Sequence, residues 1–158
     1  MHVLLIIRAL TILGGLIMWN YEHSIFTTSS PISIWNLYQD ISKWSKWDDE
    51  IIEAHLDGPF TTGSIGSLTV LNQKPGTFIL KEVKENRSFT NVMVIDELNI
   101  QIAFYHYINN ADSQTKITHG VSISGLHAKE IGGQIGPLLT KNIPRSMDRL
   151  VKLAGENE

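Results

Sequence analysis

The sequence predicts an α+β fold in which one antiparallel β-sheet of about six or seven strands packs against a long C-terminal helix. Three observations support this fold class. Segments rich in β-branched and aromatic residues, or alternating between apolar and polar residues, recur between residues 18 and 124. Polar or glycine-containing turns separate most of them, which favours antiparallel pairing. An amphipathic helical stripe then occupies residues 128–154, so helices and strands are segregated along the chain.

The length and composition indicate a single domain. A chain of 158 residues can bury its own core, and 42% hydrophobic residues exclude a disordered chain. The net charge of −3 gives no broad positive field, so no nucleic-acid partner is expected. The absence of cysteine excludes disulfides and thiolate metal sites.

Residues 1–17 form an apolar N-terminal extension before a domain of residues 18–158. Three interpretations of the extension stay open. It is a helix or strand that packs on the domain or on a second copy in a homodimer, an upstream extension of a chain that functionally begins at Met18, or a membrane anchor or uncleaved signal. A helix of this length covers about 25 Å, less than the roughly 30 Å of bilayer hydrocarbon. We expect a cytoplasmic protein, with membrane association through residues 1–17 as the alternative.

A strand and two short helical segments are expected first. Residues 18–28 have strand-forming composition. Ser29 or Ser30 before Pro31 is typical of a helix start. The helix has apolar side chains at helical spacing, and a second helical turn holds Trp44 and Trp47. The acidic residues 48–50 that follow are expected to be solvated.

Six further strands are expected at residues 51–57, 67–72, 77–85, 88–95, 98–108 and 115–124. The fifth of these is the clearest. One of its faces is apolar except for a histidine, and consists of Leu98, Ile100, Ile102, Phe104, His106 and Ile108. The last strand has the corresponding face Ile117, His119, Val121 and Ile123.

His106 and His119 are titratable residues on otherwise apolar strand faces. A hairpin turn midway between them would place them opposite each other, with Cβ atoms about 4.5–5.5 Å apart. They are either ligand-binding or acid–base groups, or core histidines bonded to a neighbouring tyrosine, serine or carbonyl. Two imidazoles do not complete a zinc site, so no metal is expected.

The C-terminal helix has a broad apolar stripe formed by Ile131, Ile135, Leu138, Leu139, Ile143, Met147, Leu150, Val151 and Ala154. Pro144 removes a backbone donor and predicts a kink at residues 141–143. Gly132, Gly133, Gly136 and Pro137 are expected to weaken the start of the helix, so that its first turns are either loose or separately wound.

Several motifs resemble the START-like (SRPBCC) superfamily, in particular its polyketide cyclase/dehydrase-like branch. Residues 40–48 read D-x-x-x-W-x-x-W-D, and residues 58–66 read G-P-F-x-x-G-x-x-G. Gly136, Pro144, Met147 and Leu150 match landmarks of the terminal helix of that branch. The resemblance runs from about Met18 to Ala154.

The resemblance implies a helix-grip fold, in which a curved sheet wraps around the terminal helix and encloses an apolar cavity. Relatives bind lipids, sterols, polyketides, quinones or plant hormones, mostly without a cofactor, so no cofactor is expected here. The leading hypothesis is therefore binding of a small hydrophobic molecule of lipid, polyketide or quinone type. The candidate ligand-binding residues are His106, His119, Ile102, Phe104, Ile117, Val121, Ile135, Leu139, Trp47 and Phe60.

Two other functions stay open at this stage. The chain is a cyclase- or dehydratase-like enzyme that uses His106 and His119 for acid–base chemistry, or it is a protein-interaction module without a ligand. A superfold hosts many functions, so the motifs do not decide whether the chain is an enzyme.

Overall fold

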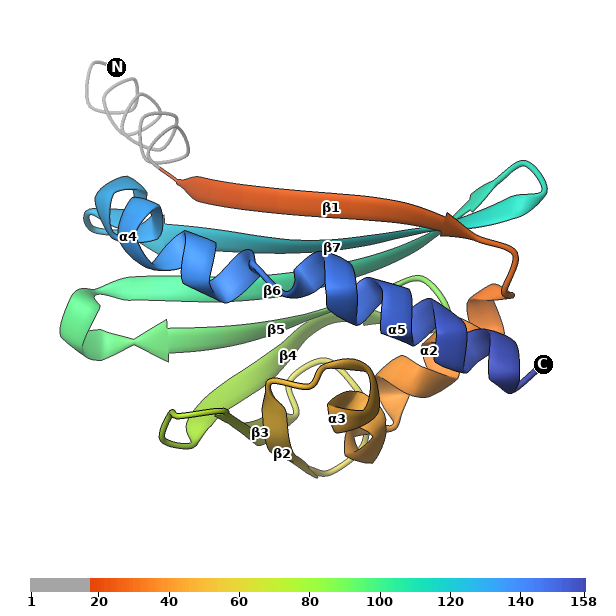
Figure 1. The fold of residues 1–158 in the computed structure, drawn as a ribbon. Helices are drawn as coiled ribbons and strands as arrows, with labels where there is room; N and C mark the ends of the chain where they lie inside the picture. The colour runs from red at the N-terminus through yellow and green to blue at the C-terminus, as the bar shows by residue number, and fades with distance from the viewer. Residues whose placement is uncertain (1–17) are drawn as a thin grey trace, which may run out of the picture.

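The structure is a computed structural model that describes residues 18–158 (Figure 1). It confirms an α+β fold with one curved antiparallel sheet and C-terminal helices. The elements in chain order are β1 (Trp19–Thr27), α2 (Pro31–Gln39), η1 (Ile41–Lys43), α3 (Trp44–Trp47), β2 (Ile51–Asp57), β3 (Ile65–Val70), β4 (Gly76–Lys84), β5 (Ser88–Ile95), η2 (Asp96–Leu98), β6 (Ile100–Ala111), β7 (Gln114–Gly125), α4 (Ala128–Thr140) and α5 (Ile143–Glu156).

The seven strands form one antiparallel sheet in the order β1-β7-β6-β5-β4-β3-β2. The first strand therefore pairs with the last, and β2 forms the other edge. The pairing register shifts between Lys81 and Lys84 in β4, and between Ile51 and Glu53 in β2. Such irregularities bend a strand and increase its twist, which helps the sheet to curve. Figure 1 shows α4 and α5 running along the inner face of the sheet.

The two short helical segments begin where the sequence predicts. Ser30 caps α2 by accepting a hydrogen bond from the Ser33 N–H, and Pro31 occupies the first turn. Asp40 then ends α2 and caps η1 by accepting from the Ser42 N–H. This sharp change of direction brings α3 over β2, so its tryptophans enter the core.

The β6–β7 hairpin confirms the predicted pairing of the histidines. His106 and His119 are direct partners, and the turn is centred on Asp112 and Ser113. The predicted start of the β6 strand at Leu98 was wrong. Leu98 ends the 3-10 helix η2, and Asn99 adopts a left-handed conformation with φ of 52°, so the alternating pattern was read two residues too early.

The C-terminal stripe forms two helices rather than one kinked helix, with the break at the predicted residues 141–143. Pro144 lies in the first turn of α5, where its missing N–H costs nothing. The first turns are not loose, because α4 is one α-helix from Ala128 to Thr140, but the alternative that they are wound separately is confirmed, since α4 ends before α5 begins. A Cβ atom at Gly132 or Gly136 would overlap the Trp19 side chain, so these glycines let α4 pack closely on β1.

The core between helices and sheet has two parts. The larger, aromatic cluster lies under α2, α3 and α5 and includes Trp35, Tyr38, Trp44, Phe78 and Phe89. The smaller, aliphatic cluster consists of Ile100, Ile102, Val121, Ile123 and Ala128, with residues of α4 packed against it. Leu138 of the predicted stripe faces outward with 64% of its surface exposed.

The predictions for residues 1–17, including their role as an anchor, a dimer contact or an upstream extension, concern residues outside the described part of the chain. Within residues 18–158, no helix has both the length and the apolar character that crossing a membrane requires.

Candidate functional site

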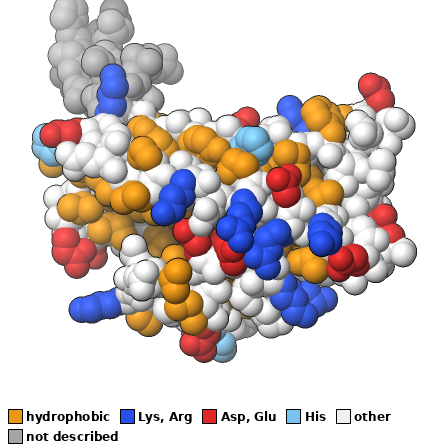
Figure 2. Space-filling model, in the orientation of Figure 1, with side chains coloured by type: hydrophobic (Ala, Val, Ile, Leu, Met, Phe, Trp, Pro, Cys, Tyr) orange, Lys and Arg blue, Asp and Glu red, His pale blue; other side chains and the backbone are white. Residues whose placement is uncertain are grey.

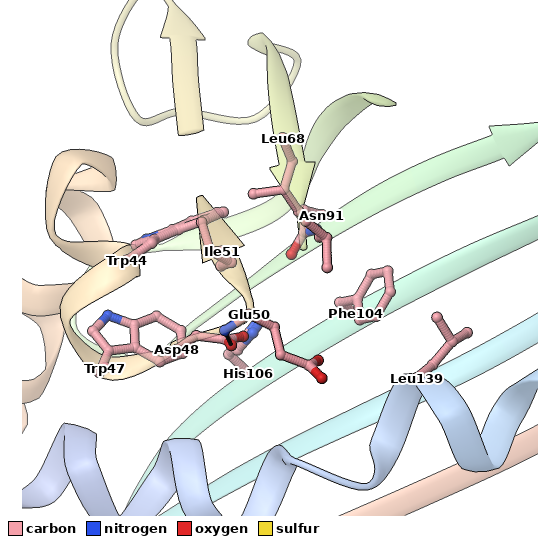
Figure 3. Close-up of a pocket in the computed structure, with 11 residues that line it drawn as sticks. Trp44, Trp47, Asp48, Glu50, Ile51, Leu68, Asn91, Phe104, His106 and Leu139 are labelled. Carbon is pink, nitrogen blue, oxygen red and sulfur yellow. Dashed lines mark hydrogen bonds between the residues drawn. The ribbon is translucent and has the colours of Figure 1, made fainter. Parts of the chain in front are cut away.

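A cavity opens where the aromatic and aliphatic parts of the core meet (Figure 3). Its volume is about 130 Å³. Side chains from α3, the α3–β2 connection, β2, β3, β5, β6 and α4 enclose it. They are Trp44, Trp47, Asp48, Glu50, Ile51, Leu68, Val70, Asn91, Phe104, His106 and Leu139.

A second, smaller cavity of about 80 Å³ adjoins the first. The two share Asp48, Glu50, Phe104, His106 and Leu139 as lining residues. The smaller one extends toward β7 and the α4–α5 joint, where it is lined by His119, Gly120, Asn142, Ile143 and Ser146. Together they form one site, which we call the histidine cavity.

The two predicted histidines are buried side by side, with 9% of His106 and 4% of His119 exposed. Their ring centroids lie 4.6 Å apart. The Nε2 atom of His119 lies 2.7 Å from the hydroxyl oxygen of Tyr38, and the two groups share a hydrogen bond. Burial, with additional repulsion from His106 and His23, holds the pKa of His119 well below its ordinary value. His119 is therefore a neutral imidazole tied to the core.

His106 keeps one ring nitrogen free. Its Nδ1 donates a hydrogen bond to the carbonyl oxygen of Phe89, 3.3 Å away. Its ring stacks on the Phe89 ring at a centroid distance of 4.0 Å, which fixes the orientation. Burial lowers the pKa of His106 to about 3, so the imidazole is neutral. Since Nδ1 carries the proton, Nε2 is a hydrogen-bond acceptor, and no hydrogen bond joins it to another of residues 18–158.

Asp48 is a cavity residue that the sequence reasoning treated as solvated. It follows Trp47 at the end of α3 and lines both parts of the cavity. Burial raises the pKa of Asp48 to about 6, with further increases from the carboxylates of Glu50 and Asp49. A hydrogen bond donated by the Glu50 N–H to Oδ1, 3.1 Å long, and the charge of Arg149 act in the opposite direction.

Asp49, between the two cavity carboxylates, behaves as predicted for a solvated residue. Its Oδ2 lies 2.8 Å from Arg145 Nη2 and 3.2 Å from Arg149 Nη1. Figure 2 shows basic side chains gathered beside acidic ones in the centre of this face. Of the three consecutive acidic residues, Asp49 therefore lies at the surface, whereas Asp48 and Glu50 line the cavity.

Asn91 is a second cavity residue that the sequence reasoning missed. Only 4% of it is exposed, and it lies opposite Phe104 in the β5–β6 pairing. Asn91 lines the cavity, and no hydrogen bond joins its amide group to another of the described residues (Figure 3). The available signal was its place in the alternation Phe89, Asn91, Met93, where an amide replaces an apolar residue on the inner face.

The comparisons with solved structures concern the fold. The crystal structure of Ara h 8.0201 matches with a TM-score of 0.70 and 11% identity, over 88% of this chain and 99% of that one. Norcoclaurine synthase from Thalictrum flavum, in complex with dopamine and hydroxybenzaldehyde, matches with a TM-score of 0.67 and 14% identity, over 89% and 88%. Protein MLL2253 from Mesorhizobium loti matches with a TM-score of 0.67 and 10% identity, over 89% and 99%.

These neighbours are Bet v 1-like proteins of the START/SRPBCC superfamily. The chain has the START-like, helix-grip fold. No family model matches it. The uncharacterized protein YdcF of Bacillus subtilis (strain 168) is 35% identical over 57 residues, which are 36% of this chain and 59% of YdcF. The chain thus spans about three-fifths of the length of that relative. The likeness to the polyketide cyclase/dehydrase-like branch continues to rest on the sequence motifs alone.

In this START-like chain, half of the candidate ligand-binding residues surround the histidine cavity. These are His106, His119, Phe104, Leu139 and Trp47. The others pack elsewhere. Ile117 and Phe60 belong to the aromatic cluster, whereas Ile102, Val121 and Ile135 belong to the aliphatic one. Phe60 contacts Trp35 and Phe89 rather than the cavity mouth. Their roles in binding stay predictions.

Among residues 18–158, no group of three potential metal-ligating side chains is close enough to hold an ion. The cavity instead offers apolar walls and a few polar atoms without protein partners: Nε2 of His106 and the amide of Asn91. Such an arrangement can hold a small, mostly apolar molecule and orient it by hydrogen bonds.

Proposed function

We propose that the chain binds a small, largely apolar molecule in the histidine cavity. The observation that carries this proposal is the combination of apolar walls with two largely buried polar side chains that line the cavity, His106 and Asn91. Within residues 18–158, neither the Nε2 atom of His106 nor the amide of Asn91 makes a hydrogen bond. Buried polar groups are normally hydrogen-bonded, so a ligand or water has to satisfy them.

The volume favours a compact ligand over an acyl chain. Pockets for drug-sized molecules measure about 300–1,000 Å³, whereas an apolar cavity of about 150 Å³ holds benzene. The main chamber here measures about 130 Å³. Within the lipid, polyketide and quinone-like ligands expected from the sequence, this space suits a molecule with one ring and a short substituent.

A single-ring alcohol, 2-phenylethanol, is a suitable first probe. Burying roughly 200 Å² of apolar surface contributes about 5 kcal/mol, which corresponds to a Kd on the order of 0.1–1 mM. Titration followed by amide NMR is expected to shift the signals of Asn91, Phe104 and His106 in a saturable manner. The fluorescence of Trp44 and Trp47, which line the cavity, gives an independent readout.

A pair of neighbouring substitutions tests the location. Leu139→Trp is expected to fill the cavity and abolish the shifts, because Leu139 lines both chambers. Leu138→Trp is the matched control on the same helix, since Leu138 is mostly exposed and lines neither. Equal binding by the two variants, or no saturable shift in the unmodified chain up to several millimolar, would overturn the proposal.

A second candidate function is acid–base catalysis in the same cavity. The observation that favours it is Asp48, a carboxyl group whose pKa burial raises to about 6, close to the neutral imidazole of His106 in the cavity lining. Norcoclaurine synthase, a neighbour in fold, is described in complex with dopamine and hydroxybenzaldehyde. Incubating the chain with this pair and searching for a new product by mass spectrometry is a direct test.

If a product forms, Asp48→Asn and His106→Gln are expected to abolish it, and titration of the same variants with 2-phenylethanol separates a loss of catalysis from a loss of binding. Product formation that persists in both variants would remove these residues from catalysis.

A further inference from the structure

The polar groups of the histidine cavity are almost all hydrogen-bond acceptors. Two carboxylates, Asp48 and Glu50, line both chambers, and neither chamber is lined by lysine or arginine. The Nε2 atom of His106 accepts because Nδ1 already donates to Phe89. The Oδ2 atom of Asp48 has no donor among the described residues, since the Glu50 N–H binds Oδ1.

The basic residues nearest to this acidic run are used elsewhere. Arg145 and Arg149 on α5 both contact the Asp49 carboxylate. Arg149 also donates a hydrogen bond to the carbonyl oxygen of Lys46 at 3.0 Å. Neither arginine lines the cavity, so within residues 18–158 the carboxylates of Asp48 and Glu50 line it without an ion-pair partner.

Two further observations point to a ligand rather than to an isolated acidic cluster. His106 and Asn91 are both more than nine-tenths buried and line the same space, and within residues 18–158 neither His106 Nε2 nor the Asn91 amide makes a hydrogen bond. The same lining includes Trp44, Trp47 and Phe104, whose aromatic rings attract cations through their π-systems. Hydrogen-bond acceptors, carboxylates and aromatic rings therefore all line the histidine cavity.

Building on the proposed function, we propose that the ligand of the histidine cavity is a single-ring molecule with a protonated amine, and that Asp48 and Glu50 bind its cationic nitrogen. The ring occupies the chamber between Phe104, Leu139 and the tryptophans, and the ammonium group donates hydrogen bonds to the carboxylates. A ligand with a carboxylate would meet like charge and no donor from lysine or arginine.

Three probes of nearly equal size test this proposal: 2-phenylethylamine, 2-phenylethanol and phenylacetate, which carry positive, zero and negative charge. Kd values are measured by NMR titration at pH 8, where the amine is protonated and Asp48 is ionised. The amine is expected to bind about tenfold more tightly than the alcohol, as a charge-assisted hydrogen bond provides. Phenylacetate is expected to bind at least tenfold more weakly than the alcohol.

Substitutions within the acidic run provide matched controls. Asp48→Asn and Glu50→Gln are each expected to remove most of the preference for the amine, measured as the ratio of the Kd values of the alcohol and the amine in the same variant, because each removes one negative charge from the cavity lining. Asp49→Asn, which changes the carboxylate that pairs with the arginines, is expected to keep the preference. Circular dichroism checks that each variant is folded.

The outcomes separate the two proposals. If the alcohol binds and the amine binds no better, the charge preference is refuted and the ligand site stands. If phenylacetate binds as tightly as the amine, or if Asp49→Asn and Asp48→Asn reduce the preference equally, the assignment to Asp48 and Glu50 is refuted. If none of the probes binds, both proposals fall.

Discussion

The two halves of the space between sheet and helices are filled by different kinds of side chain. Under α2, α3 and α5, aromatic rings interlock: Trp44 stacks on Phe89 with centroids 5.7 Å apart, and Tyr38 contacts Phe89 at 5.1 Å. Under α4, branched aliphatic residues such as Ile102 and Val121 form a smaller cluster. The cavity lies at the boundary between them. The contrast indicates that the aromatic half holds the fold together, whereas the boundary leaves room for a ligand.

The largest expected effect is the loss of an interlocked ring. Phe89→Ala is expected to lower the free energy of unfolding by about 3–5 kcal/mol, because it leaves a hole beside Tyr38, Trp44 and His106. Leu139→Ala, at the existing cavity, is expected to cost only about 1 kcal/mol. Urea unfolding measures both. Equal losses would contradict the division into a filled half and a hollow boundary.

The pH dependence of stability tests the burial of the histidines. The pKa of folded His106 is about 3, below its ordinary value of 6.5. As the pH falls below 6.5, this histidine binds a proton in the unfolded chain but stays neutral in the folded chain. The free energy of unfolding therefore decreases. Between pH 7.5 and 5.0 this amounts to about 2 kcal/mol. Asp48 opposes it in part, because its raised pKa lets the folded state bind a proton first, from about pH 6 downward.

Urea unfolding at several pH values in this range is the measurement. His106→Gln is expected to remove the roughly 2 kcal/mol assigned to His106, and the buried, neutral His119 keeps its own contribution of the same sign. His55→Gln, at an exposed position on β2, is expected to leave the pH dependence unchanged. The same slope for the unmodified chain and His106→Gln would contradict a buried, neutral His106.

Substitutions at the contact between α4 and β1 are expected to change the free energy of unfolding by an intermediate amount. Gly132→Ala should cost about 1–2 kcal/mol net, because the new methyl group overlaps Trp19. Gly133→Ala is its control on the next residue, where nothing lies within 4 Å, and should stabilise the helix by up to about 1 kcal/mol. Thermal unfolding compares them. A stabilising Gly132→Ala would show that α4 does not pack closely on Trp19.

The smallest expected effect concerns the surface ion pairs. Asp49→Asn removes the partner of Arg145 and Arg149, both substantially exposed. The expected loss in the free energy of unfolding is within about 0.5 kcal/mol and disappears at high salt. A decrease of more than about 1 kcal/mol in the free energy of unfolding, measured with urea, would mean that these ion pairs stabilise the packing of α5.

Most of the fold was accessible from the sequence because local patterns encode it. The capping of α2 by Ser30, the strand alternation and the break before Pro144 each depend on neighbouring residues. The pairing of His106 with His119 also followed, since a two-residue turn at Asp112 fixes the register of the whole hairpin.

The site was less accessible because its composition depends on contacts distant in sequence. Three consecutive acidic residues carry no periodic signal, so only the path of the chain from α3 into β2 turns Asp48 inward and Asp49 outward. The glycines of α4 were read as weak points because their partner, Trp19, lies at the other end of the chain. Ile117 and Phe60 have the right polarity for a cavity wall, but they pack in the aromatic cluster and do not line the histidine cavity.

The joint at residues 141–142 lies beside the smaller chamber of the histidine cavity. α5 contacts α2 and α3 over the aromatic core, whereas α4 contacts β1 and β7. Both helices reach the cavity, α4 through Leu139 and α5 through Ile143 and Ser146, and Asn142 of the joint lines it between them. A change in the angle at this joint would therefore alter the shape of the cavity from two sides at once.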